Sequence, residues 1–596
     1  MPVMATQEQA AGVRWDLTPL FAGTDQAREA LAAAIETAQA FAERWRGRME
    51  TLDGAELAAA LAELGEIDNQ LSRIGSYSAL RRSVDVTSEE NRDFSAAVEQ
   101  GMVEAVNHLR FFELEWLALP DERAQQLAAA PEVAADRHHL ISQRRYAPHT
   151  LSEPEERVLA ERDAAAVSAW QALFGQTTST IEVPFDDGGG EQPHTIDRLL
   201  AYVHDERRDV RQRALEALYE SLEPRAEVLA HCYDSLVGDR LVIDRLRSYG
   251  DDPMRQTHLR NELDGDVVMR MLDAVDARVG IAQRWFRAKA AMLDLPKLEL
   301  WDQYAPVGTA RSVDYTEARA IVDEAFAGFS DTVREIADAF FTEQRIDAEP
   351  RAGKRGGAFC APVAQDAAPY VMLNFTDHMT DVLTMAHELG HGMHFALAGT
   401  HQTPHSAYTG LALAEVPSTF AEFIAFDHLL AGEQDAVTRK VLAAERAEGA
   451  FASIFRQSVL ARYEQRAYAQ RARATALTPD RLGEIWVEEN ARYYGDALGL
   501  PDGYRLGWAY IPHFINTRFY TYAYVFAKLV ALVLYSRYRE DGDAFAGPYL
   551  ELLAAGGSGD PATLLRPLGV DLTAADVWDS AFVELERMVA AAEAEI

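Results

Sequence analysis

The stretch that decides the fold runs from residue 381 to residue 397 and reads DVLTMAHELGHGMHFAL. It contains no proline, its only glycines are Gly390 and Gly392, and it predicts one continuous helix. His387 and His391 are four residues apart, so they lie within about 40° of one another on one helical face, one turn apart. Both imidazoles can therefore reach a single ion.

Glu388, which lies between the two histidines, is the candidate catalytic residue. Zinc accepts imidazole nitrogens at about 2.0–2.1 Å, and a catalytic site uses three protein ligands and a water molecule. Glu388 follows the first histidine at the edge of the ligand face, where a carboxylate can take a proton from that water without binding the metal. The five-residue pattern occurs by chance in roughly one of every twenty-five shuffled chains of this composition. By itself the pattern therefore gives only the hypothesis of a zinc site.

A third ligand is available 24 positions beyond His391, in the segment AEVPSTFAE of residues 414–422. Glu415 is far enough along the chain for a loop and a second helix to return beside the first. Because proline is tolerated in a first helical turn, Pro417 places Glu415 near the start of that helix or at a kink. The alternative is a solvated or capping glutamate. Glu422, two turns further, either braces a ligand histidine or is a surface charge.

A related class of zinc helix is excluded. The longer pattern HExxHxxGxxH requires a glycine three residues after His391 and a histidine six residues after it, and those positions hold His394 and Leu397. His394 is therefore predicted to pack or to support a ligand, because two histidines and Glu415 already complete the site.

The composition indicates a globular protein of several lobes. The chain has 596 residues, of which 48% are hydrophobic and 25% are charged. The formal net charge of −37 repels phosphate backbones and anionic lipid, so neither nucleic acid nor a membrane is expected as a partner. This acidity favours solubility, and the alternative is an electronegative channel that attracts cationic peptides.

Cysteine usage and the apolar segments predict a cytoplasmic protein. Cys232 and Cys360 are the only cysteines, so the fold does not depend on disulfides, and both are expected to be reduced and structural. Residues 1–21 lack a basic region followed by a long apolar one, so no conventional secretory signal is expected. The most apolar late stretch, residues 524–535, is interrupted by Lys528 and is too short to span a bilayer.

Helical periodicity dominates the N-terminal third. Residues 51–74 place apolar side chains at steps of three to five, and Asp53 can cap the start of this helix. Residues 91–119 follow the same pattern up to Pro120. Further helices are expected from about residue 196 to residue 344.

Two patches break this helical pattern. Residues 177–194 predict a short hairpin, with a strand over 178–183 and a turn at 186–190. The turn contains the glycines 188–190, but no Lys-Ser/Thr pair follows them. A turn is therefore favoured over a phosphate-binding loop. Residues 356–361 and 370–375 predict two strands immediately before the motif helix. The predicted fold class is therefore mainly α, with a small β-sheet beside the zinc helix.

Several motifs together resemble the thimet oligopeptidase family of zinc metallopeptidases, and within it the oligoendopeptidase F branch. The matching segments are the helix motif at 387–394, EVPS at 415–418, GKRGGAF at 353–359, WDLTPLF at 15–21 and HTLSEPEE at 149–156. The resemblance covers most of the chain. It implies an elongated two-lobed helical metallopeptidase with a deep central channel, made of an N-terminal helical domain over residues 1–200 and a zinc metallopeptidase catalytic domain over residues 201–596.

The resemblance also implies the roles of the motif residues. One zinc ion per chain is expected to bind to His387, His391 and Glu415, while Glu388 acts as general base and then as proton shuttle. The strand around residues 356–360 is expected to pair with the substrate backbone. The implied activity is that of a zinc-dependent oligoendopeptidase, which hydrolyses internal bonds of short unfolded peptides.

A late segment resembles the family's C-terminal His and Tyr segment, whose side chains hydrogen-bond the substrate and the oxyanion. The candidates are His513, Tyr520, Tyr522 and Tyr524, and two of the three tyrosines are expected at the site. Tyr520 and Tyr524 share a helical face, whereas the closest match to the family pattern favours Tyr520 and Tyr522. The alternative for His513 is a core position.

Three other functions stay open at this point. The first is a dipeptidyl carboxypeptidase-like exopeptidase on the same scaffold, and the second is a non-catalytic peptide- or metal-binding homologue, against which the intact Glu388 argues. The third is a helical scaffold with a coincidental motif, which would leave Glu415 and the late tyrosines unexplained. Short peptides are the expected partners, and the sequence predicts neither the oligomeric state nor the preferred peptide bond.

Overall fold

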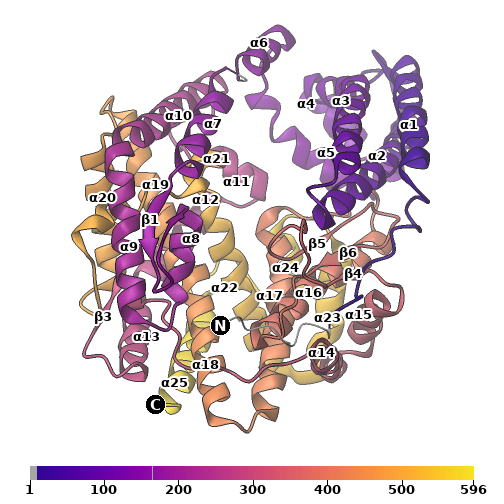
Figure 1. The fold of residues 1–596 in the computed structure, drawn as a ribbon. Coiled ribbons are helices and arrows are strands. Elements are labelled where there is room, and N and C mark those ends of the chain that lie inside the picture. Colours follow the sequence, from indigo (N-terminus) through magenta and orange to yellow (C-terminus); the bar gives the residue numbers. More distant parts are fainter. Residues whose placement is uncertain (1–9, 164) are drawn as a thin grey trace. The chain divides into compact units, whose positions relative to one another are not determined.

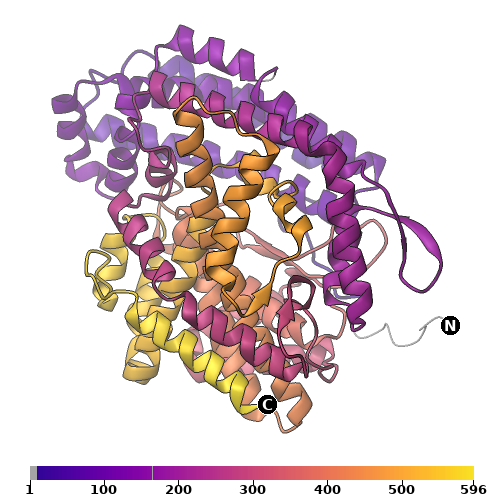
Figure 2. The same cartoon turned by 90° about the vertical axis from the view of Figure 1, so that its left-hand side faces the viewer.

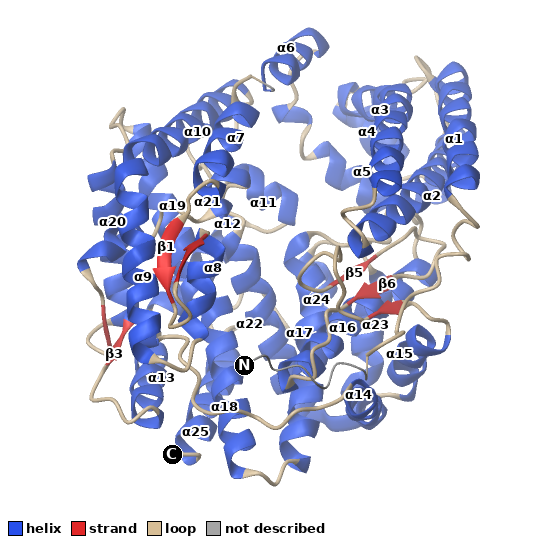
Figure 3. Ribbon diagram, in the orientation of Figure 1, coloured by secondary structure: helices blue, strands red, loops and turns tan. Residues whose placement is uncertain are grey.

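The structure is a computed structural model that describes residues 10–163 and 165–596. The first nine residues of segment 1–21 lie outside these ranges. Helices make up most of the described chain, and its strands form three small sheets (Figure 3). The predicted mainly α fold class is confirmed. Within the described ranges, no helix is long and apolar enough to cross a membrane.

The chain folds into two compact units, and each unit is assembled from three separate stretches of sequence. Unit 1 comprises Met1–Ala147, Arg311–Gly432 and Val533–Asp571. Unit 2 comprises Pro148–Ala310, Glu433–Leu532 and Leu572–Ile596. The expected division near residue 200, into an N-terminal helical domain and a catalytic domain, stays a prediction.

Unit 1 contains an N-terminal group of helices and the helices that carry the predicted metal-binding motif (Figure 1). Its helices are α1 (Thr24–Trp45), α2 (Gly54–Val84), α3 (Glu89–Ala118), α4 (Asp121–Ala128), α5 (Arg137–Arg144), α14 (Tyr315–Phe329), α15 (Asp331–Thr342), α16 (Met379–His401), α17 (Leu411–Gly432), α23 (Ala546–Ala555) and α24 (Pro561–Leu565). Its strands are β4 (Ile346–Asp347), β5 (Phe359–Ala361) and β6 (Tyr370–Met372).

The helix predicted over residues 51–74 is α2. Asp53 caps its start as predicted. The Asp53 carboxylate accepts the Glu56 N–H at 2.9 Å, and the Glu56 carboxylate accepts the Asp53 N–H. The helix continues to Val84, ten residues beyond the predicted end. Its apolar face packs with α1 and α3 around buried side chains such as Phe41 and Phe94, so burial rather than local propensity extends it.

The two strands predicted before the motif helix are confirmed in shortened form as β5 and β6. They pair antiparallel, with Cys360 opposite Val371. β4, which was not predicted, pairs parallel with the other side of β6. Two residues are too few to show the alternation that marks a strand in a sequence. The sheet order β4–β6–β5 leaves β5 at the edge.

Unit 2 is mainly helical, and its helices come from both halves of the chain (Figure 2). Its helices are α6 (Glu153–Asp163), α7 (Val167–Ser179), α8 (Ile196–Ala201), α9 (Arg208–Leu222), α10 (Ala226–Leu246), α11 (Arg255–Asn261), α12 (Gly265–Asp276), α13 (Val279–Met292), α18 (Ala436–Phe451), α19 (Gln457–Ala472), α20 (Pro479–Tyr494), α21 (Pro512–Asn516) and α25 (Asp579–Ala594). Its strands are β1 (Val183–Asp186), β2 (Glu191–His194), β3 (Leu298–Glu299) and β7 (Leu498–Gly499).

α10, α19 and α20 pack together, and α25 packs on α13 and α18. α22 (Thr521–Asp541) begins in unit 2 and ends in unit 1.

The predicted hairpin is present as β1 and β2, and its turn is confirmed. The Asp186 carboxylate accepts the N–H groups of Gly188 and Gly190 at 2.8 and 2.9 Å. The strand predicted over residues 178–183 is wrong for most of its length, since α7 extends to Ser179 and the strand begins only at Val183. Tertiary packing of α7 against α10 overrides the local β propensity there.

Candidate metal centre

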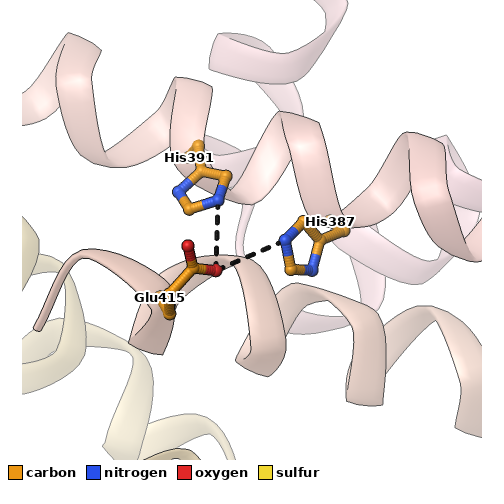
Figure 4. Close-up of side chains that lie close together, drawn as sticks. All are labelled: His387, His391 and Glu415. Carbon is orange, nitrogen blue, oxygen red and sulfur yellow. Dashed lines mark ion pairs between the residues drawn. The ribbon is translucent and has the colours of Figure 1, made fainter. Parts of the chain in front are cut away.

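Two helices of unit 1 bring the three predicted ligands together (Figure 4). α16 presents His387 and His391, one turn apart, and α17 presents Glu415. The Nε2 atoms of the two imidazoles each lie 3.5 Å from Oε2 of Glu415. One possible ligand atom from each residue lies within 4.8 Å of the other two, so the group could hold a metal ion.

The spacing of these atoms fits a tetrahedral ion. At the bond lengths of about 2.0–2.1 Å that zinc makes, two ligand atoms of a tetrahedral site are about 3.4 Å apart. The two N–O separations of 3.5 Å match that distance. Three protein ligands leave one position for water, as in catalytic rather than structural sites.

The charges around His387 stabilise a cation. Burial lowers the pKa of this imidazole, but Glu415 and Glu422 outweigh burial and raise the pKa to about 10. Burial raises the pKa of the Glu415 carboxyl, but the His387 and His391 imidazoles outweigh it and hold this pKa well below its usual value. Metal binding needs neutral imidazoles and an ionised carboxylate. The same carboxylates that favour a proton on His387 therefore favour a metal ion in its place.

Glu422 supports the first histidine from its other side. His387 Nδ1 lies 3.8 Å from Glu422 Oε2, while His387 Nε2 faces Glu415. A carboxylate behind a ligating imidazole fixes the orientation and tautomer of the ring. Of the two interpretations left open by the sequence, the structure favours a brace over a surface charge.

The close approach of α16 and α17 depends on Gly390. A Cβ atom at this position would lie 2.6 Å from the Ser418 Cα and 2.7 Å from the Pro417 carbonyl oxygen, and both of these are backbone atoms that cannot turn away. Ser418 Oγ in turn lies 3.3 Å from Glu415 Oε2, to which it can donate. Gly390 thus sets the distance between the helix that carries the histidines and the helix that carries the carboxylate.

We expect Gly390→Ala to weaken the site and the fold together. The added methyl group must push α17 away, at a cost of about 1–3 kcal/mol in the free energy of unfolding, and metal affinity should fall because Glu415 moves with that helix. Chemical denaturation and a competitive chelator titration measure the two effects. The matched control is Gly328→Ala on α14, where nothing lies within 4 Å of the added atom. The control should be neutral or stabilising by about 0.5–1 kcal/mol, and equal behaviour of both variants would contradict this account.

Glu388 follows His387 directly on α16 and is not a member of the group of three predicted ligands. Its side chain is 7% exposed on α16, which packs against β5. Burial raises the pKa of its carboxyl, and the imidazoles of His387 and His391 partly oppose this. The backbone of Cys360 also lowers that pKa, so the edge strand faces this carboxylate. A buried carboxylate with a raised pKa next to a metal position is suited to accept and hold a proton.

Neither cysteine supplies a thiolate. Both Cys232 and Cys360 are free, and burial raises the pKa of each thiol. For Cys360, the nearby Glu388 carboxyl raises the pKa further. Protonated thiols are poor ligands and nucleophiles, which agrees with the predicted structural role.

His394 lies outside the ligand group, as predicted. Its side chain is 3% exposed, and its Nδ1 atom has no hydrogen-bond partner among the described residues. Burial lowers the pKa of this imidazole to about 4, so the ring is neutral at physiological pH. It packs against Phe395 with ring centroids 5.9 Å apart.

In unit 2, three of the four late candidates lie together. The rings of His513 and Tyr520 are 6.0 Å apart, and those of Tyr520 and Tyr524 are 5.0 Å apart. The Tyr524 hydroxyl donates to the Tyr520 hydroxyl oxygen at 3.1 Å. All three side chains are half-buried. Burial lowers the pKa of His513, and the Arg456 guanidinium lowers it further.

Tyr522 is the exception, and the structure argues against its predicted contact with substrate. Its side chain has no exposed surface. The Tyr522 hydroxyl lies 3.1 Å from His258 Nδ1 and accepts the Asn261 side-chain amide at 3.2 Å. Residues two apart on a helix point in nearly opposite directions. Tyr522 therefore faces the interior, whereas Tyr520 and Tyr524 do not.

The segment that holds Tyr520 has buried anchors that the sequence analysis missed. The Arg518 guanidinium pairs with the buried Asp244 carboxylate through bonds of 2.7 and 2.6 Å. Phe519 adopts a left-handed φ of 50°, and its N–H donates to the buried Glu464 carboxylate at 3.0 Å. An arginine within an apolar, aromatic stretch was the available sequence signal, because a buried guanidinium needs a partner.

Comparison with known proteins identifies the family. Residues 201–584, more than half of the chain, match the family described as Peptidase family M3. The chain belongs to peptidase family M3. Residues 115–182 match a second region, described as Oligopeptidase F. The predicted resemblance to oligoendopeptidase F is therefore confirmed.

Relatives of this M3 chain cover almost its whole length. It is 28% identical over 599 residues to Group B oligopeptidase PepB of Streptococcus agalactiae, with 97% of each chain covered. It is 24% identical to Oligopeptidase PepF of Bacillus subtilis, with 90% of this chain and 80% of the relative covered. A solved structure of a putative peptidase from Chlamydophila abortus has a TM-score of 0.87 at 21% identity, and covers 99% of this chain and 100% of its own. Oligoendopeptidase-F from Enterococcus faecium has a TM-score of 0.71 at 20% identity, with 96% and 98% covered.

Family membership and geometry point to the same class of enzyme. In this M3 chain, the His387, His391 and Glu415 side chains converge as a metallopeptidase requires. The metal-dependent peptidase is thereby favoured over a non-catalytic homologue and over a scaffold with a coincidental motif. The solved structures support the fold, and the sequence match carries the family.

Proposed function

We propose that this M3 chain is a zinc-dependent oligoendopeptidase that hydrolyses internal bonds of short, unfolded peptides. The observation that carries the proposal is the approach of two imidazole nitrogens to one carboxylate oxygen, each at 3.5 Å, beside a buried glutamate. His387, His391 and Glu415 would hold one zinc ion per chain. Zinc bound there would polarise the scissile carbonyl and lower the pKa of the attacking water.

Glu388 is the proton carrier in this proposal. Its carboxylate accepts a proton from the attacking water, since it adjoins the ligands without occupying a ligand position. Burial raises the pKa of the carboxyl, which favours keeping that proton while the carbonyl carbon becomes tetrahedral. Glu388 then passes the proton to the departing amine. Following the resemblance, we assign to His513, Tyr520 and Tyr524 hydrogen bonds to the substrate and to the developing oxyanion.

The edge strand β5 is the proposed partner of the substrate backbone. Its sheet order leaves it with β6 on one side and no second partner strand in the described ranges. The loop before it is held firmly: the buried Lys354 ammonium donates to the carbonyls of Asp347 and Glu349 at 3.1 and 3.0 Å. A preformed strand edge binds an extended peptide through main-chain hydrogen bonds without selecting its sequence. The expected channel between two lobes stays a prediction.

Metal analysis combined with product analysis tests this function. Peptides of graded length, blocked at both ends, are incubated with the purified chain with and without a chelator, and the products are identified by mass spectrometry. We expect one zinc ion per chain, internal cleavage of the short blocked peptides, loss of cleavage with chelator and recovery with added zinc. Release of C-terminal dipeptides only from unblocked peptides would instead establish the exopeptidase. Peptide binding without any cleavage would establish the non-catalytic homologue.

A further inference from the structure

An aromatic row extends the metal-binding face of α16. Phe395 lies one turn beyond His391, and its ring stacks on that imidazole with centroids 6.2 Å apart and planes 12° apart. Tyr408, in the loop between α16 and α17, meets the Phe395 ring edge-on at 6.0 Å. His387, His391 and Phe395 follow one another at steps of four residues, so they drift by only about 40° per step around the helix. The row therefore begins at the ligand histidines and ends at Tyr408.

The far end of this row is accessible. Tyr408 is 39% exposed, the largest fraction for any Phe, Tyr or Trp that the structure describes, and Phe395 is half-buried. Burial of an aromatic ring stabilises a fold by the apolar area it removes from water. Rings left accessible beside a functional group are typical of binding surfaces rather than of cores.

The loop that carries Tyr408 has a fixed backbone. The Gln402 side-chain amide donates to the Ala554 carbonyl at 2.8 Å, and the Gly557 N–H donates to the Ser406 carbonyl at 2.8 Å. Both bonds tie the loop to the end of α23 in the same unit. A ring presented from a fixed backbone loses little conformational entropy when a ligand side chain binds to it.

We propose that Phe395 and Tyr408 form a subsite for one large apolar or aromatic side chain of the peptide substrate, within two residues of the scissile bond. This inference rests on the proposed peptidase function, which brings the scissile carbonyl to His387 and His391. One helical turn spans about 5.4 Å, and an extended peptide advances about 3.4 Å per residue. A ring one turn beyond His391 therefore meets the side chain of the first or second residue from the cleaved bond. Stacked and edge-on ring contacts favour aromatic and large aliphatic side chains over alanine.

A peptide series with matched variants tests this subsite. The substrates are blocked peptides that differ at a single position, which carries Phe, Leu or Ala. Two positions on each side of the cleaved bond are varied in this way. The zinc-loaded chain hydrolyses each peptide, and kcat/KM is measured. At one of these positions the wild-type chain should prefer Phe or Leu over Ala by about tenfold or more. Tyr408→Ala and Phe395→Ala should each lower kcat/KM for the Phe and Leu peptides more than for the Ala peptide, so that the preference falls several-fold. Cleavage of the Ala peptide also reports that each variant is folded.

Two control variants sharpen the result. Tyr408→Phe keeps the ring and should keep the preference, whereas Val103→Ala removes a 62% exposed apolar side chain from α3 in the same unit and should change nothing. The subsite is overturned if both alanine variants keep the preference, or if the wild-type chain shows no side-chain preference. Either result leaves the proposed function intact. Failure of the zinc-loaded wild-type chain to cleave any peptide overturns the proposed function, and the subsite with it.

Discussion

Glu388→Gln should abolish nearly all peptide hydrolysis while the metal stays bound. Glutamine keeps the shape of the side chain but cannot accept a proton from the attacking water, and loss of a general base typically costs about 10²–10⁴-fold in rate. His387, His391 and Glu415 are untouched by the change, and Glu388 is not a member of their group. Steady-state kinetics and metal analysis of the same preparation measure the two properties together.

The matched control for this variant is Glu335→Gln. Glu335 is an exposed carboxylate on α15 in the same unit, so the same change in charge and shape is made away from the ligands. Its turnover and metal content should equal those of the wild-type chain. Unaltered activity of Glu388→Gln would remove Glu388 from its role as base, and loss of the metal from that variant would make it a ligand instead.

Glu415→Gln should release the metal and, with it, the activity. A neutral amide oxygen replaces the one charged ligand atom, which lies 3.5 Å from both imidazole nitrogens. Removal of a residue behind a metal ligand typically costs about 10–100-fold in metal affinity, and removal of a ligand itself should cost more. A competitive chelator titration measures the affinity, and excess zinc should restore part of the activity. An unchanged affinity would show that Glu415 is not a ligand.

The same variant has a distinct signature in proton release. In the wild-type chain the pKa of His387 is raised to about 10, so at neutral pH its proton must leave before a metal binds, and metal affinity should rise as the pH rises toward that value. Without the Glu415 carboxylate the pKa of His387 should fall, and fewer protons should be released per metal bound. Calorimetric titrations in buffers of different ionisation enthalpy count these protons. Equal proton release in both chains would contradict the assigned contact between His387 and Glu415.

Patterns along one helix were enough to predict the first half of the site. His387, Glu388 and His391 belong to a single uninterrupted helix, and a four-residue step brings two side chains to one face whatever surrounds them. The exclusion of the longer HExxHxxGxxH class followed from the same local spacing, because the positions three and six residues after His391 hold His394 and Leu397. Asp53 as a helix cap is a prediction of this kind too, since a capping box involves only residues three apart.

Residues on different elements were predicted less completely. The sequence offered Glu415 as a ligand and left Glu422 open, because nothing local tells whether α17 returns beside α16. It could not separate Tyr522 from Tyr524, since that choice depends on which face of α22 packs against His258 of α11. The two-residue strand β4 is likewise defined only by its partner β6.

The sequence by itself determined the mainly α fold class, the motif helix with its two histidines and its glutamate, and the resemblance to an oligopeptidase family. Only the tertiary structure decided that Glu415 reaches the histidines, that Glu422 lies behind His387, and that Tyr522 faces inward. The physical reason is that helical periodicity is a short-range property of the backbone. Convergence of side chains, in contrast, depends on packing between distant segments, such as the contact of Gly390 with the backbone of α17.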